Sequence, residues 1–137
     1  MSLVALHALP PLILAVVATN FALALWAVAV ILTKQRTLPR AFWTVLLLSL
    51  AVLVVQVAAG IMLAAGGSRP KTALHFLYGV LVTGTALVQF GIRPGGFLRT
   101  AIAKDPTTFR ESRLLALICL TQAALIVRAY TTGAFGK

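Results

Sequence analysis

Residues 41–66, AFWTVLLLSLAVLVVQVAAGIMLAAG, decide the fold class, because this long run carries no charged side chain. Only Thr44, Ser49 and Gln56 interrupt its apolar character with polar groups. A helix needs about 20 predominantly apolar residues to cross the hydrocarbon core of a membrane. The run is long enough for that, and it predicts a transmembrane helix.

Three further apolar runs lie at residues 3–32, 72–92 and 114–132. The first is too long for the apolar part of a signal peptide and has no basic residue before it, so we interpret it as a retained helix. The chain is 61% hydrophobic and 10% charged, with a mean hydropathy of +1.02, whereas soluble domains have about 45–50% apolar and about 25% charged residues. The sequence therefore predicts an all-α fold, in which residues 1–137 form one transmembrane domain. We expect an integral membrane four-helix bundle with up-down-up-down topology.

The distribution of positive charge predicts the orientation of this bundle. Eight of the twelve Lys and Arg residues lie in two polar segments on one side, residues 33–40 and the basic loop 93–113. These eight are Lys34, Arg36, Arg40, Arg93, Arg99, Lys104, Arg110 and Arg113. The other side has Arg69, Lys71, Arg128 and Lys137. Cytoplasmic loops carry the excess of Lys and Arg. We therefore expect both termini outside, in a bacterial inner (cell) membrane.

The charged residues and the single cysteine also exclude classes of function. The net charge is +10, but the chain has no basic stripe with interleaved aromatic residues, so we expect a lipid bilayer and no nucleic acid as partner. The one cysteine excludes a dithiol pair, and the only acids, Asp105 and Glu111, lie in the basic loop. A proton-coupled exporter needs an acid inside the membrane, and an intramembrane protease needs a catalytic pair or a metal motif. The sequence therefore predicts that the protein is not an independent enzyme.

Residues 97–104 of the basic loop leave two interpretations open. Their apolar and basic side chains alternate at helical spacing, as in an amphipathic helix that lies on the inner membrane surface and attracts anionic lipid. The same residues also fit an ordinary basic loop.

Three amides lie deep within the apolar runs, namely Asn20, Gln89 and Gln122. Polar groups in hydrocarbon must find partners within the protein. We expect these side chains to form a network that holds the first, third and fourth helices together. We expect Cys119 to be an inert apolar residue of the fourth helix.

A second polar layer is predicted near the outer surface. The only two histidines, His7 and His75, lie near the starts of the first and third runs, so they share one depth if these helices are parallel. Tyr78 follows His75 on the same helical face. The same end of the bundle also receives Arg69, Lys71 and Arg128.

This outer layer has three interpretations. In the first, the histidines anchor helix ends at the headgroups. In the second, His7 and His75 ligate the iron of haem b, whose propionates pair with Arg69, Lys71 or Arg128. In the third, His75, Tyr78 and Arg128 hold a quinone or an anionic lipid headgroup.

The proline pair at residues 10–11 weighs against the haem interpretation, because a bend there can carry His7 away from His75. Met62, near the outer end of the second run, would then be the replacement ligand. The function that we expect is an accessory or electron-transfer subunit, with other membrane-protein subunits as partners. The alternatives are a small transporter or channel component, and a quinone- or lipid-binding membrane protein without haem.

Overall fold

The computed structural model describes residues 3–35, 37–103 and 109–136. It contains six helices within these residues: α1 (Leu3–His7), α2 (Pro10–Leu32), α3 (Arg40–Ala65), α4 (Leu74–Ile92), α5 (Arg99–Ile102) and α6 (Glu111–Ala134). The described part of the chain contains no strand, which confirms the all-α class.

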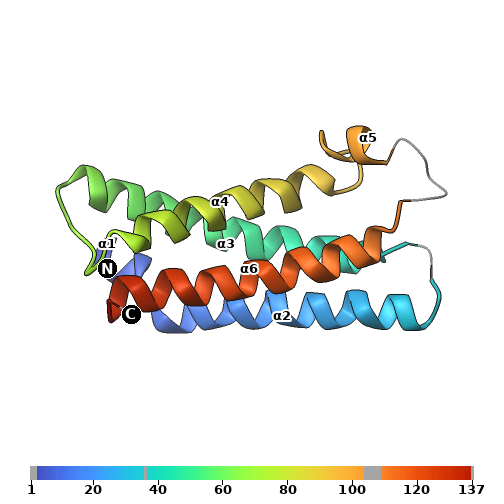
Figure 1. The fold of residues 1–137 in the computed structure, drawn as a ribbon, viewed down its shortest axis with the longest axis horizontal. Coiled ribbons are helices and arrows are strands. Elements are labelled where there is room, and N and C mark those ends of the chain that lie inside the picture. The colour runs from blue at the N-terminus through green and yellow to red at the C-terminus, as the bar shows by residue number, and fades with distance from the viewer. Residues whose placement is uncertain (1–2, 36, 104–108, 137) are drawn as a thin grey trace.

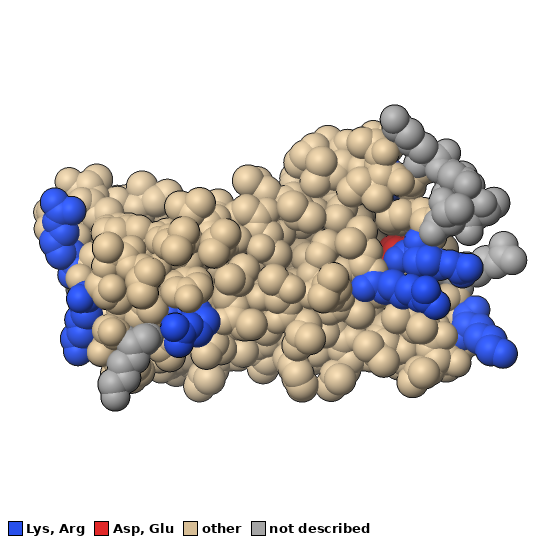
Figure 2. Space-filling view, in the orientation of Figure 1, with Lys and Arg blue, Asp and Glu red and all other residues tan. Residues whose placement is uncertain are grey.

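Four segments are long and apolar enough to cross a membrane, as the sequence predicted: Leu3–Leu32, Arg40–Ala65, Leu74–Ile92 and Glu111–Ala134. Large apolar side chains also cover their outer surfaces; Leu32 is 76% exposed and Val80 is 69% exposed. On the face seen in Figure 2, the Lys and Arg side chains gather toward the two ends and leave an uncharged band between them. This distribution fits a lipid bilayer around the middle of the bundle.

The long helices lie side by side, and the described chain begins and ends at the same end of the bundle (Figure 1). The closest packing joins α6 to α2 on one side and to α4 on the other, and α2 also packs against α3. Leu23, Phe42, Leu46 and Leu115 are almost completely buried in the core. By comparison, α3 and α4 have only a slight contact.

The first membrane segment is broken in two by its proline pair. Leu9 is extended, with φ −66° and ψ 105°, and α2 starts with Pro10 and Pro11 in its first turn. A proline there costs least, because the first helical N–H groups have no partner within the helix. The break frees α1 to turn away from the axis of α2 and to pack against α3.

Residues 97–103, for which the sequence left an amphipathic helix and an ordinary basic loop open, contain a single helical turn, α5. Leu98 anchors this turn to the end of α4: its N–H donates to the carbonyl of Gly91 at 2.9 Å. Its side chain lies where a Cβ on Gly91 would stand. Phe97 and Ile102 remain 61% and 46% exposed. The end of the predicted helix at Lys104 lies outside the described residues.

The sequence placed Glu111 in the basic loop, but the structure shows that it is the first residue of α6. Its side chain is 3% exposed, pairs with the guanidinium of Arg99 and accepts the N–H of Leu38 at 2.9 Å. The carboxylate therefore joins α5, α6 and the segment before α3. These partners explain why α6 starts three residues before the predicted position, since a buried carboxylate must be hydrogen-bonded or paired.

We predict that Glu111→Ala lowers the free energy of unfolding by about 3 kcal/mol, because it leaves Arg99 and the buried N–H of Leu38 without their partner. Arg113→Ala, a change of an exposed residue in the same turn, is the control. Thermal unfolding in detergent, followed by circular dichroism, measures both variants. Equal midpoints for the two variants would show that Glu111 does not hold this end of the bundle together.

Candidate functional site

The structure brings the two histidines together at the end of the bundle where the described chain begins and ends (Figure 1). The rings of His7 and His75 have centroids 5.7 Å apart, and their planes cross at 87°. His7 is the last residue of α1 and His75 lies in the first turn of α4. The bend at the prolines therefore does not carry His7 away from His75. Met62, the replacement ligand that the sequence suggested, is 58% exposed.

A backbone carbonyl and a glycine of α3 hold the ring of His7. Its Nδ1 lies 2.8 Å from the carbonyl oxygen of Gln56. One turn further along α3, a Cβ on Gly60 would stand only 2.6 Å from Cε1 of the ring. No side chain could occupy that place, so the imidazole reaches the helix backbone because residue 60 is a glycine.

The ring of His75 repeats this arrangement on α6. Its Nδ1 lies 2.8 Å from the carbonyl oxygen of Ala129, and a Cβ on Gly133 would stand 2.6 Å from the same Nδ1. In both cases the glycine follows the carbonyl residue by one helical turn. We call each set of one imidazole, one carbonyl and one glycine a carbonyl clamp. The first clamp is His7–Gln56–Gly60, and the second is His75–Ala129–Gly133.

The two clamps fix the chemistry of the imidazoles. A carbonyl oxygen can only accept, so Nδ1 of both His7 and His75 must carry the proton. In a neutral imidazole, Nε2 then has a free lone pair. Nε2 of His7 also lies near α3, since it would stand 3.3 Å from a Cβ on Gly60. The site thus brings together two imidazoles that are held by different helices, α3 and α6, and each keeps Nε2 as a possible ligand atom.

The other predicted site residues surround this pair without all contacting it. Arg128 lies with its guanidinium 5.5 Å from the ring centre of Tyr78, in a cation–π contact between α6 and α4. Arg69 and Lys71 are exposed on the turn that leads into α4. His75, Tyr78 and Arg128 are thus neighbours, because His75 also bonds to the residue after Arg128.

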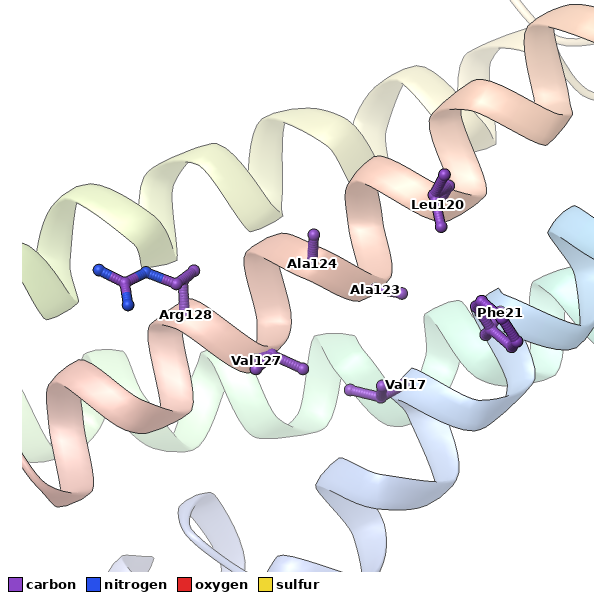
Figure 3. Close-up of a pocket in the computed structure, with 7 residues that line it drawn as sticks. All are labelled: Val17, Phe21, Leu120, Ala123, Ala124, Val127 and Arg128. Atoms are coloured by element: carbon purple, nitrogen blue, oxygen red, sulfur yellow. The ribbon is translucent and has the colours of Figure 1, made fainter. Parts of the chain in front are cut away.

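A separate groove of about 410 Å³ opens between α2 and α6. It is lined by Val17, Phe21, Leu120, Ala123, Ala124, Val127 and Arg128. Figure 3 shows Arg128 at one end, with its guanidinium turned toward α4 and away from the apolar residues. The groove includes neither histidine and offers no polar group beyond Arg128, so its lining suits apolar chains.

Deeper in the bundle, polar side chains connect four helices. Asn20 accepts from Nε2 of Gln89 at 3.0 Å and donates to Oγ of Ser49 at 3.2 Å, and Gln89 also contacts Sγ of Cys119 at 3.4 Å. The expected link between Asn20 and Gln89 is present, and Ser49 and Cys119 extend it to α3 and α6. Gln122 bonds instead to the carbonyl of Val82 at 3.2 Å. The network contains no ionised group, which fits a role in holding helices together.

No family model, curated protein or solved structure matches this chain. The functional argument therefore rests on the contacts themselves. Sequence reasoning missed Gly60 and Gly133, the two glycines that admit the rings. The available signal was that Gly60 and Gly133 lie at the same end of the bundle as the histidines, each on the long helix that follows a histidine-bearing segment.

We predict that Gly60→Ala destabilises the protein by about 1–3 kcal/mol, because the added methyl group overlaps the ring of His7. Gly84→Ala is the matched control, since a Cβ there meets nothing within 4 Å and alanine favours a helix by about 1 kcal/mol over glycine. Thermal unfolding in detergent should show opposite shifts. A Gly60→Ala variant as stable as Gly84→Ala would contradict the close fit of the ring.

Proposed function

We propose that this protein binds one haem b between His7 and His75 and acts as an electron-transfer or accessory subunit of a larger membrane complex. The single observation that carries the proposal is the pair of rings 5.7 Å apart, each with its Nδ1 hydrogen-bonded to a helix carbonyl. A hydrogen bond of this kind is the usual outer support of a metal-bound histidine, because it fixes the tautomer and the direction of the ring.

The spacing of the rings fits axial ligation of one metal ion. Histidine–metal bonds of about 2.0–2.1 Å, added to about 1.2 Å between Nε2 and the ring centre, put the centroids of two opposed imidazoles about 6.4 Å apart. The observed 5.7 Å is somewhat shorter, so the rings would separate slightly to admit a metal ion. Covalent c-type attachment needs a pair of cysteines before a histidine, and the chain has one cysteine. A haem here would therefore be of the b type, held by its ligands and by non-covalent contacts.

Groups around the histidines also suit a flat, partly charged cofactor. The contact between α3 and α4 is slight, and a Cβ on Gly79, one turn below His75, would meet nothing within 4 Å. Nε2 of Gln56 is buried without a partner among the described residues, so α3 has a donor to offer. Arg69, Lys71 and Arg128 supply the positive charge that propionates require.

The ligand set favours electron transfer over catalysis at the metal. Haem supplies a one-electron redox centre, and histidines on both faces leave no coordination position for a substrate. His7 and His75 would hold the iron, and the carbonyls of Gln56 and Ala129 would orient their rings. This division of roles fits a subunit that passes electrons and performs no reaction of its own.

The proposed setting is a bacterial inner membrane, with up-down-up-down helices and both termini outside. The excess of Lys and Arg in the segments 33–40 and 93–113 supports this orientation. Both ends of the described chain lie at the opposite end of the bundle (Figure 1), where His7 ends α1 and His75 lies in the first turn of α4. Apolar side chains around the helices, among them Leu14 at 66% exposed, offer surface to lipid and to partner subunits.

We predict a Soret band and a reduced-minus-oxidised α-band in protein purified from haem-replete cells. His75→Ala and His7→Ala should each abolish the low-spin spectrum, because each removes one axial ligand. Leu77→Ala is the control, since this side chain is exposed on the same helix as His75. No Soret band in the unaltered protein would rule out the cofactor, and a band that survives both histidine changes would disprove the ligands.

We predict an outside location for a reporter fused after Lys137 and a cytoplasmic location for a reporter inserted at Lys104. The physical reason is the retention of basic loops on the cytoplasmic side. Paired alkaline phosphatase and fluorescent protein fusions measure both positions. A cytoplasmic Lys137 would overturn the orientation and leave the haem proposal to its own spectroscopic test.

A further inference from the structure

The two carbonyl clamps do more than bring the histidines together, because they also set how the two rings are turned. An imidazole N–H lies in the plane of its ring, so a bond to a fixed carbonyl restricts rotation about the Cβ–Cγ bond. The carbonyls of Gln56 and Ala129 belong to two different long helices. The ring planes that result cross at 87°.

The glycines restrict the rings from the same helices that supply the carbonyls. A Cβ on Gly60 or on Gly133 would stand 2.6 Å from an atom of its histidine ring. Each ring is therefore placed by three groups: its own backbone, a carbonyl that accepts its proton, and a glycine against which it packs. A ring held in this way keeps its orientation when Nε2 gains a ligand.

We propose that Gln56, Gly60, Ala129 and Gly133 are positioning residues that hold His7 and His75 as axial ligands with crossed imidazole planes. This inference rests on the proposed haem site and adds to it the geometry of the ligands. Gln56 and Ala129 position the rings through their backbone carbonyls and not through their side chains. The two glycines are thus the positions at which substitution can test the inference.

Crossed ligand planes have a recognisable electronic consequence. When two axial imidazoles are parallel, they split the two π-type d orbitals of low-spin ferric iron, and the electron paramagnetic resonance spectrum is rhombic with three resolved features. When the planes are perpendicular, these orbitals stay nearly degenerate, and the spectrum is dominated by one strongly anisotropic low-field feature. The 87° angle between His7 and His75 therefore predicts the anisotropic type.

The test is a low-temperature electron paramagnetic resonance spectrum of the full-length ferric protein in detergent. We expect the anisotropic low-field signal. A three-line rhombic signal would overturn the crossed geometry while leaving the haem proposal intact. Protein that carries no haem at all would instead refute the proposed function, so the two failures are distinguishable.

Two glycine substitutions then test the positioning role. Gly60→Ala should replace the anisotropic signal by a rhombic or high-spin one, because the new methyl group turns or displaces His7. Gly84→Ala, which places a methyl group in open space, should leave the signal unchanged. An unchanged signal in Gly60→Ala would contradict the role of this glycine. If that variant does not fold, Gly133→Ala on His75 and the spectrum of the unaltered protein still decide the proposal.

Discussion

The hydrogen bonds from two imidazole N–H groups to two helix carbonyls are the interaction on which the proposed site depends. In hydrocarbon, a polar side chain without a partner is costly, and the nearest available acceptors are backbone carbonyls. An imidazole can reach such a carbonyl only if no side chain covers it, which explains why residues 60 and 133 are glycines. It also requires that α1 leave the axis of α2, and the break before Pro10 provides this. A proline pair that looked unfavourable for the site is thus part of what forms it.

The same need for polar partners shapes the rest of the bundle, but with a different result at each depth. In the middle, Asn20, Ser49 and Gln89 join helices through neutral hydrogen bonds, and the side-chain oxygens of Gln89 and Gln122 have no partner among the described residues. At the end of the bundle away from the histidines, the buried carboxylate of Glu111 binds Arg99 and a backbone N–H. At the histidine end, each imidazole donates one N–H and keeps a second nitrogen, which is a good metal ligand. This difference is why we locate function there.

The fold was largely predictable from the sequence, and the site only in part. Long uncharged runs such as 41–66 leave little choice but membrane helices, and the common depth of His7 and His75 follows from counting residues along parallel helices. What could not be predicted depends on neighbours in space. Gly60 and Gly133 belong to helices that follow the histidines by about fifty residues or more. The early start of α6 depends on the contact of Glu111 with Arg99. The partner of Gln122 is a backbone carbonyl. A backbone acceptor leaves no mark in the sequence, since every residue has one.

The most direct test of the central claim is the amount of haem b bound per polypeptide, measured as the pyridine haemochrome in purified protein of known concentration. Both proposed ligands come from one chain and lie within one bundle. The account therefore predicts one haem per chain, whatever the oligomeric state. A ratio of one haem for every two chains would place the iron between subunits and contradict the site. Protein free of haem after expression with ample haem would contradict the function itself.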